Sequence, residues 1–391
     1  MKVVHFCCVA PPQGGGMGLA ADWEVKLLRK RGSEAWLVAP KKSGIESAEY
    51  VIRASAISFG NGAIIKGLEK FVEDADIVHL HYPFYGTAGK IAKLKKQGKI
   101  KRLVMTLHMD AKANGLSGLA FDFHRQHFQK EIIDAADLLF VSTLDYARTS
   151  SFGYLVEQND PRLHELPFGV ETDRFSPLSV IPPMDIGGIQ NLDPRVKPED
   201  DKKKFGIPDG AKVIGTVSVM DRAHRFKGID LLLKAAVDYP SAYILLVGDG
   251  NIRAEYERLV ADLGIADRVR FAGKLSNEDL ITAFRSMDIF AFPSTSGAEA
   301  FGIAMLEAMS CGIPVIASAL PGVREVAKDA GLLVTPNDVK DLSRAMGEML
   351  NNDQKRQEFA QAARAKALDY DWSKHGDILL SNYRKLCGSP S

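Results

Sequence analysis

Two glutamates, Glu299 and Glu307, carry the strongest chemical signal in the sequence. Residues 301–309 are predicted to form a helix, so Glu299 precedes it and Glu307 lies nearly two turns inside it. The N–H groups of Gly302 and Ile303 would point out of the helix start and suit a diphosphate. A carboxylate inside the helix can accept hydrogen bonds from a ribose diol, and one before it can bind sugar hydroxyls. Chance glutamates on a solvated face are the alternative.

A basic pair, Arg222 and Lys227, follows a strand predicted at residues 213–217. Cations at this position would neutralise the charge that develops on a departing diphosphate. A basic pair in a loop is usually only solvated. The prediction therefore depends on its location opposite the glycine-rich loop described next.

Glycines are clustered at residues 14–18, directly after the first predicted strand and before the first predicted helix. Glycines let backbone N–H groups approach phosphate oxygens, and the helix N-terminus adds partial positive charge. The spacing is not that of a dinucleotide fingerprint, and the second predicted strand ends at Ala39-Pro40 without an acid for a ribose. A plain tight turn remains the alternative.

His108 follows the strand predicted at residues 103–107. Polar residues at the carboxyl ends of core strands are common in binding sites. A structural histidine is the alternative. His79 and His81 share this ambiguity and rank lower, because they could merely line a cleft.

Short apolar runs alternate with longer amphipathic segments, which is typical of βα units and parallel sheets. Leu19, Trp23 and Leu27 recur at four-residue spacing, which predicts a first helix with one buried face. Further helices are expected at residues 228–237, 253–263 and 277–286. The expected strands comprise five in the first half and six in the second: residues 3–9, 35–39, 77–81, 103–107, 138–142, 213–217, 244–247, 269–271, 289–292, 315–317 and 332–334.

The pattern predicts an α/β protein with two Rossmann-like, doubly wound domains facing across a cleft. Residues 1–175 would form the first domain and residues 205–371 the second; that the first is the acceptor side and the second binds the nucleotide sugar is implied only by the family resemblance given below. The proline-rich, charged stretch 176–204 is interpreted as a linker with an inserted loop. Residues 353–385 are predicted to form two helices, of which the last, about 372–391, joins the first domain.

Composition limits the possible functions. The chain has 391 residues, 46% of them hydrophobic and 25% charged, with a net charge of +1. This predicts neither nucleic-acid binding nor bulk membrane binding. The four cysteines lack zinc-site spacing, and adjacent Cys7 and Cys8 are expected to be buried thiols. The first apolar run is too short for a signal sequence or a membrane span, so a cytoplasmic protein is expected.

Taken together, these residues resemble glycosyltransferase family 4, the retaining group with the GT-B fold. The similarity runs over nearly the whole chain and is strongest at residues 299–309, which match the family's two glutamates separated by seven residues. Other similar segments are residues 167–170 with 173–175, Lys227-Gly228, residues 247–250, Pro321-Gly322 with Glu325, and residues 370–372.

The resemblance implies a role for each matching position. Glu307 would bind the donor ribose and Glu299 the hydroxyls of the transferred sugar. His108 would contact the sugar near its anomeric centre, and the backbone around Leu275 would meet the base. The diphosphate would be held by Arg222 and Lys227, by the backbone of Gly302 and Ile303, and by Gly15 and Gly16. Phe301 would also belong to the donor-binding residues.

One departure from the family pattern concerns the arginine. Members carry Gly-Arg just after the strand, whereas Val219-Met220-Asp221 precede Arg222 here. Arg222 fits the spacing, and Arg225 is the alternative arginine for holding the diphosphate. The implied reaction is metal-independent transfer from a UDP- or GDP-linked sugar to an acceptor hydroxyl, with retention and without a side-chain nucleophile. No metal ligands are expected, and Asp74-Ala75-Asp76 precedes a strand at the wrong end for the cleft.

The acceptor side and the rival functions stay open. Residues 90–102 hold seven basic and no acidic residues, so they could rest on an anionic membrane and admit a lipid-linked acceptor, or could be a solvated helix. Rival functions are a nucleotide-sugar epimerase, a disaccharide phosphorylase and a non-catalytic nucleotide-sugar sensor. A nicotinamide oxidoreductase is disfavoured by the missing ribose acid. The base, the sugar, the acceptor and the oligomeric state are not specified by the sequence.

Overall fold

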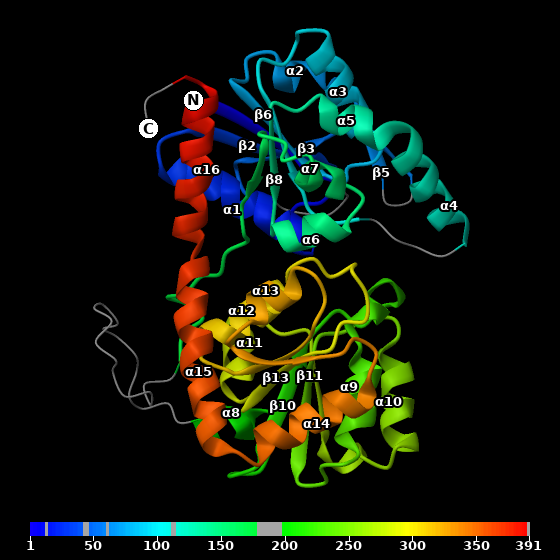
Figure 1. The fold of residues 1–391 in the computed structure, drawn as a ribbon, viewed down its shortest axis with the longest axis vertical. Helices are drawn as coiled ribbons and strands as arrows, with labels where there is room; N and C mark the ends of the chain where they lie inside the picture. The colour runs from blue at the N-terminus through cyan, green and yellow to red at the C-terminus, as the bar shows by residue number, and fades with distance from the viewer. Residues whose placement is uncertain (12–14, 42–46, 60–61, 111–114, 178–197, 389–391) are drawn as a thin grey trace. The chain divides into compact units, whose positions relative to one another are not determined.

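The computed structural model describes the chain except for residues 12–14, 42–46, 60–61, 111–114, 178–197 and 389–391. It divides into two compact units, which are considered separately (Figure 1). Unit 1 comprises Met1–Gly169 and Trp372–Ser391, and unit 2 comprises Val170–Asp371.

Unit 1 is built around a seven-stranded parallel sheet in the order β3-β2-β1-β6-β7-β8-β9. Its strands are β1 (Lys2–Phe6), β2 (Glu34–Pro40), β3 (Val51–Ala54), β6 (Ile77–Tyr82), β7 (Leu103–Leu107), β8 (Leu138–Val141) and β9 (Leu163–Glu165). A separate antiparallel hairpin consists of β4 (Ala56–Phe59) and β5 (Gly62–Ile65).

The helices of unit 1 connect these strands and cover the sheet. They are α1 (Gly16–Lys30), α2 (Glu69–Val72), α3 (Ala88–Lys96), α4 (Gly115–His124), the π-helical segment η1 (Arg125–Gln129), α5 (Lys130–Asp134), α6 (Leu144–Thr149), α7 (Gly153–Glu157) and α16 (Trp372–Leu386). Helices α1 and α16 lie side by side although they come from opposite ends of the chain (Figure 1).

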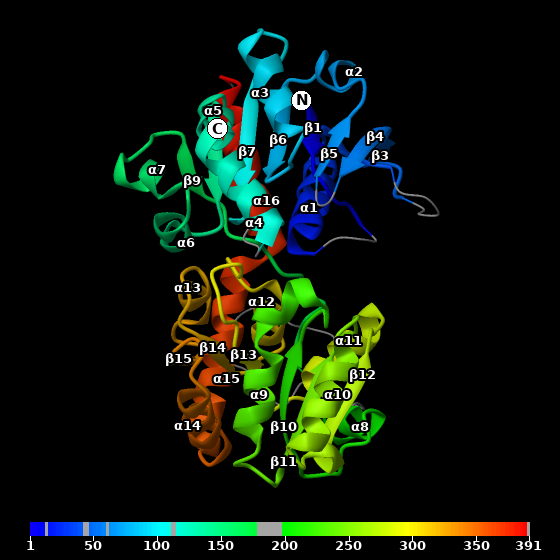
Figure 2. The same ribbon diagram turned by 90° about the vertical axis from the view of Figure 1, so that its right-hand side faces the viewer.

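Unit 2 is built around a six-stranded parallel sheet in the order β12-β11-β10-β13-β14-β15 (Figure 2). Its strands are β10 (Lys212–Val217), β11 (Ala242–Val247), β12 (Val269–Gly273), β13 (Ile289–Phe292), β14 (Val315–Ser318) and β15 (Gly331–Val334). The 3-10 turns are η2 (Arg222–Lys227), η3 (Ala266–Arg268) and η4 (Leu368–Tyr370). The helices are α8 (Pro198–Lys204), α9 (Ile229–Ala236), α10 (Arg253–Asp262), α11 (Asn277–Arg285), α12 (Ile303–Ser310), α13 (Val323–Ala327), α14 (Val339–Leu350) and α15 (Asp353–Ala367).

The predicted fold class is confirmed, because both sheets are parallel and reverse direction in strand order as doubly wound sheets do. Each of the eleven predicted strands has a counterpart within a few residues. The sequence analysis did not predict β3, β4, β5 and β9, which are three to four residues long. Residues 170–175, expected in the first domain, belong to unit 2, and residues 198–204 of the expected linker form α8.

The buried face of α1 agrees with the predicted one at Leu27 but differs from it at Leu19 and Trp23. Leu19 and Trp23 are only partly buried, whereas Asp22 and Glu24 are buried with the apolar residues of the helix. Trp23 instead stacks on Trp372 at the start of α16, with ring centroids 5.5 Å apart. The polar residue Glu24 therefore points into the interior of unit 1.

The structure shows the burial of the cysteines and the length and character of the described helices. The structure describes all four cysteines, and none of them forms a disulfide. Cys7 is buried as predicted, whereas the prediction of a buried Cys8 is wrong, because Cys8 is partly exposed. Cys311 is buried and Cys387 is partly exposed. Among the residues that the structure describes, no helix has both the length and the apolar character needed to cross a bilayer.

Candidate active site

In unit 2, the strand order reverses between β10 and β13, so their carboxyl ends flank the position where doubly wound sheets bind ligands. The chain leaving β10 carries Arg222 and Lys227, and the chain leaving β13 carries Glu299 and then α12. The topology thus brings the predicted donor-binding residues of this unit to one edge of one sheet.

Lys227 and Glu299 form an ion pair at this edge. The Lys227 Nζ atom donates a hydrogen bond to Glu299 Oε2, and the two side chains are only 22% and 10% exposed. The ammonium also lies 5.3 Å from the centre of the Phe292 ring. Gly228, the residue after Lys227, has a φ of +72°, and a Cβ atom there would lie 2.0 Å from the Pro293 carbonyl oxygen. Glycine therefore lets the chain after Lys227 pass close to the chain that leaves β13. Two predicted site residues are therefore in direct contact.

The two candidate arginines differ in how strongly they are held. Arg225 Nη2 donates to Glu255 Oε2. Arg222 lies at the limit of an ion pair with Glu255, at 4.0 Å, and its side chain is 82% exposed. The turn is fixed by Asp221, whose carboxylate accepts from the His224 backbone N–H at 2.8 Å. Arg222 is thus the arginine with more freedom to move onto a ligand.

Helix α12 begins with Gly302 at its N-cap, with a φ of +94°. A Cβ atom at Gly302 would lie 2.9 Å from Phe292 Cε1, so glycine fits both the space and the left-handed conformation. No side chain caps this helix start, and its first turn has no acidic residue. Phe301 is 2% exposed, so its ring is buried. These features suit anion binding at the helix start.

Glu307 lies on α12 and retains some exposed surface. Burial of its carboxyl group raises the pKa of Glu307 to about 8. The positive charge of Arg174 acts to lower this pKa, and the negative charge of Glu171 acts to raise it. Leu275 lies in the connection between β12 and α11 and is half-buried. Glu307 is therefore a carboxyl in a poorly hydrated environment, ready to gain hydrogen bonds from a diol.

In unit 1, the helix start after β1 is also uncapped. Gly15 is the N-cap of α1, no side chain caps this end, and Gly15 and Gly16 are both exposed. Gly18 faces Val9, where a Cβ atom would meet Val9 Cγ2 at 3.2 Å. Gly14 lies outside the described residues.

His108 follows β7 and is 5% exposed. Its Nε2 atom lies 2.9 Å from His81 Nδ1, and its ring stacks on Phe168 with centroids 5.3 Å apart. Burial, aided by the charge of His375, lowers the pKa of His108 to about 3. The imidazole is therefore neutral at physiological pH and cannot act as a cationic acid.

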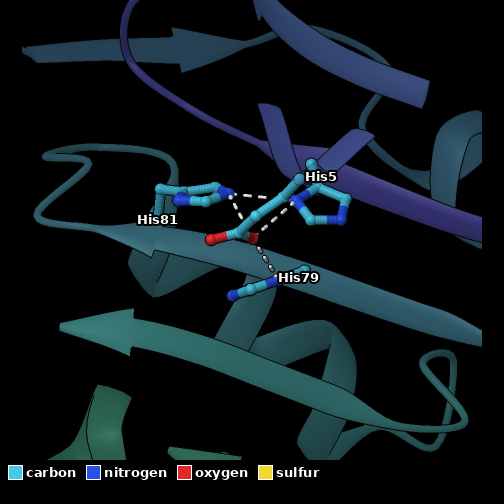
Figure 3. A group of neighbouring side chains, drawn as sticks. His5, His79 and His81 are labelled. Carbon is cyan, nitrogen blue, oxygen red and sulfur yellow. Dashed lines mark hydrogen bonds and ion pairs between the residues drawn. The ribbon is translucent and has the colours of Figure 1, made fainter. Parts of the chain in front are cut away.

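The sequence analysis did not predict two groups of side chains, although it named His79 and His81 as possible cleft residues; both are 0% exposed. His5, Glu24, His79 and His81 form a buried cluster in unit 1, and Figure 3 shows its three imidazoles turned toward one another. In unit 2, Arg364 is 7% exposed and Nη1 lies within 2.8 to 3.0 Å of acceptors on Thr172, Phe175 and Ser310. The His-x-His spacing on one strand was the available signal for the cluster.

Asp76 behaves as the sequence analysis expected. It lies directly before β6, and its carboxylate accepts from the Lys2 backbone N–H at 2.9 Å. This contact, with the charge of Lys101 nearby, lowers the pKa of Asp76. The residue connects β6 to β1 at the amino ends of the strands.

Comparison with known proteins supplies the family. The family model described as "Glycosyl transferases group 1" matches residues 197–366. Two similar proteins are D-inositol 3-phosphate glycosyltransferases. The one from Corynebacterium urealyticum is 28% identical, over 90% of this chain and 81% of its own. The one from Acidothermus cellulolyticus is 30% identical, over 79% of this chain and 67% of its own.

Solved structures agree on the fold. Sucrose-phosphate synthase from Thermosynechococcus elongatus superimposes with a TM-score of 0.76 at 20% identity, covering 99% of this chain and 100% of that one. Anabaena HepE in complex with UDP gives a TM-score of 0.73 at 17% identity, covering 98% and 100%. The chain belongs to the group 1 glycosyl transferases, the retaining GT-B family 4 enzymes that transfer a sugar from a nucleotide-diphosphate donor to an acceptor hydroxyl.

Proposed function

We propose that unit 2 binds the donor through five contacts. Glu307 accepts hydrogen bonds from the ribose, the start of α12 and Lys227 bind the diphosphate together with Arg222, and Glu299 binds hydroxyls of the transferred sugar. The observation that carries this proposal is the Lys227–Glu299 pair, largely withdrawn from solvent beside an uncapped helix start. An ammonium has three N–H donors, so Lys227 can keep Glu299 and still donate to a phosphate oxygen.

The proposed chemistry is stabilisation of a departing diphosphate. As the glycosidic bond breaks, negative charge grows on the phosphate oxygens, and fixed cations and helix N–H groups lower the barrier. The acceptor hydroxyl enters on the leaving-group face and passes its proton to the departing phosphate oxygen, which retains the anomeric configuration. No side-chain nucleophile takes part.

Gly15, Gly16 and His108 of unit 1 are proposed as donor-binding residues, as the family resemblance implies. The backbone N–H groups at the start of α1 would bind phosphate oxygens. His108 would contact the sugar as a neutral imidazole, since its pKa is lowered to about 3. Leu275 would meet the base through its backbone.

The acceptor class can be narrowed by the relatives. The curated relatives act on D-inositol 3-phosphate, as their names state, so this compound is the first acceptor to test. UDP is the first nucleotide to test, because Anabaena HepE binds it on the same fold. GDP-linked donors are the second choice.

The test is a transfer assay with purified protein, a panel of UDP- and GDP-sugars, and acceptors including D-inositol 3-phosphate. The proposal predicts a glycoside that forms only with acceptor present and keeps the donor's anomeric configuration by NMR. Conversion of the donor sugar without acceptor would indicate an epimerase, and dependence on inorganic phosphate a phosphorylase. Donor binding without any product across the panel would favour a sensor.

Membrane contact through residues 90–102 is proposed only as an electrostatic interaction. The apolar residues of this segment, Ile91, Leu94 and Ile100, are at most 5% exposed and belong to the core. Lys95 and Lys96 pair with Asp137 and Glu131 at 2.7 Å. Liposome co-sedimentation with and without anionic lipid tests it: salt-sensitive binding supports the contact, and equal binding to neutral vesicles contradicts it.

A further inference from the structure

The buried cluster of unit 1 is set by the register of its sheet. His5 of β1 pairs with His79 of β6, so the two side chains lie on one face of the sheet, and His81 lies on that face two residues further along β6. Helix α1 places Glu24 over the same face. All four residues are 0% exposed.

The four side chains meet at one point. Glu24 Oε2 lies 3.6 Å from His5 Nδ1, 3.4 Å from His79 Nδ1 and 3.7 Å from His81 Nε2. His5 Nδ1 and His81 Nε2 are 3.0 Å apart, and the four atoms all lie within 4.8 Å of one another. Tetrahedral Zn²⁺, with bonds of about 2.0 to 2.1 Å, would separate its ligand atoms by about 3.4 Å. The four distances of 3.0 to 3.7 Å are close to this value. Figure 3 shows the three imidazoles gathered at this point.

The carboxyl group of Glu24 is buried without hydrogen bonds to the residues that the structure describes. Neither of its carboxylate oxygens makes a hydrogen bond with any group in the described parts of the chain, although the side chain is fully buried. A further imidazole, that of His375, places its Nε2 atom 3.4 Å from Glu24 Oε1. A buried carboxylate without hydrogen bonds is costly, and a bound cation removes this cost.

In two of the imidazoles, the nitrogen that faces away from Glu24 has a polar contact, as is usual for histidines that bind a metal. His79 Nε2 lies 2.7 Å from Thr106 Oγ1, and His81 Nδ1 lies 2.9 Å from His108 Nε2. Such contacts fix the ring orientation of metal-binding histidines. His79 Nδ1 also lies 2.6 Å from the Tyr383 hydroxyl. A metal ion bound to His79 Nδ1 would replace this contact.

We propose that His5, Glu24, His79 and His81 bind one divalent transition-metal ion within unit 1, with Zn²⁺ the best match. Three imidazoles and one carboxylate suit the borderline-soft Zn²⁺, and four protein ligands leave no open position for substrate. The ion is therefore structural. It joins β1, β6 and α1, and it lies one hydrogen bond away from His108 through His81. None of its ligands takes part in the proposed sugar transfer.

The test measures the metal content of the full chain. The protein is expressed with added Zn²⁺, because the ligands are buried, then dialysed against a chelator and measured by mass spectrometry. Wild type is expected to keep about one equivalent. Glu24→Gln, which keeps the shape but removes the charge, and His5→Gln should each lose most of it, on the order of tenfold. His164→Gln and Glu157→Gln, exposed positions of the same residue types, are the matched controls.

Cobalt gives a second reading that does not depend on the folding of the variants. Wild type prepared with Co²⁺ should show the strong visible absorption of a four-coordinate ion. Folded wild type with less than about a tenth of an equivalent of Zn²⁺ and no such absorption would overturn the proposal. Equal metal in wild type and folded Glu24→Gln would also overturn it, because the ion would then lie elsewhere. Neither measurement involves sugar transfer, so this proposal and the proposed function fail separately.

Discussion

The Lys227–Glu299 pair is an uncommon arrangement for a structural ion pair, because both groups are largely withdrawn from solvent. Desolvation offsets much of the attraction in such pairs, so they are weak stabilising devices. Its place at the strand-order reversal of unit 2 supports the proposal that it takes part in donor binding.

Lys227→Met should therefore lower the transfer rate, on the order of 10²- to 10³-fold, through loss of a cation facing the leaving group. It should also destabilise the fold by about 1–3 kcal/mol, since Glu299 is left unpaired. Steady-state kinetics and urea unfolding measure the two effects. Lys234→Met is the control, as it removes an exposed lysine that pairs with Asp230 at 3.2 Å. Equal rates for both variants would contradict the role of Lys227.

Glu307 predicts a dependence of stability on pH. Its pKa is raised to about 8 in the folded state, against an ordinary value of 4.5. The contribution of a raised carboxyl pKa is fully present below the unfolded value and is lost as the pH rises through the folded value. Glu307→Gln should thus gain stability over wild type between pH 5 and pH 8, on the order of a few kcal/mol. Urea unfolding at the two pH values checks this, and a constant difference would contradict it.

At the residue scale, the sequence predicted what local spacing determines. Glu299 and Glu307 share one loop and one helix, so their separation is visible in the sequence. The cluster around Glu24 is not visible in this way, because it depends on the pairing of β1 with β6 and on which face of α1 is buried. The spacing of Leu19, Trp23 and Leu27 predicted a buried face of that helix that does not include Glu24.

Among the elements, α12 depends most clearly on a single residue. Gly302→Ala should destabilise the protein by roughly 2–4 kcal/mol, since it adds a left-handed alanine and a contact with the Phe292 ring. It should also weaken donor binding by shifting the helix start. Gly264→Ala separates the two causes, because Gly264 has a φ of +66° and no atom within 4 Å of an added Cβ. Equal losses of stability, by thermal unfolding, would show that the contact has no cost.

Arg364 connects α15 to the last turn of α12 and to residues 172–175. Arg364→Met removes the shared donor for three buried carbonyl groups and should cost roughly 2–4 kcal/mol. Chemical unfolding measures this. Arg344→Met, which removes an exposed arginine that pairs with Asp341 at 2.7 Å, should change stability by at most about 0.5 kcal/mol. A similar loss in both variants would show that Arg364 has no special role.

The strands that the sequence analysis predicted correctly are those with an apolar run long enough to indicate a buried strand. It missed β4 and β5, which form a hairpin outside the main sheet, and the edge strands β3 and β9. Edge strands need less apolar surface; β9, for example, contains the exposed His164 and Glu165. These strands carry little hydrophobic signal of their own.

On the scale of the whole molecule, the C-terminal helix α16 completes unit 1 although α15 belongs to unit 2. Trp372, Leu379 and Tyr383 of α16 are 4%, 0% and 0% exposed. Truncation after Asp371 should remove roughly 5–9 kcal/mol of apolar burial and leave unit 1 unfolded or aggregated. Circular dichroism and size exclusion test this, with deletion of residues 389–391 as the control. A folded, monomeric truncated protein would contradict the prediction.

The central claim is that unit 2 binds a nucleoside diphosphate through α12 and Lys227. Isothermal titration of wild type with UDP and with GDP tests this most directly. One nucleotide is expected to bind, with affinity at least about tenfold weaker in Lys227→Met and in Glu307→Gln and unchanged in Lys234→Met. If folded wild type bound neither nucleotide, or if both site variants bound as tightly as wild type, the claim would be contradicted.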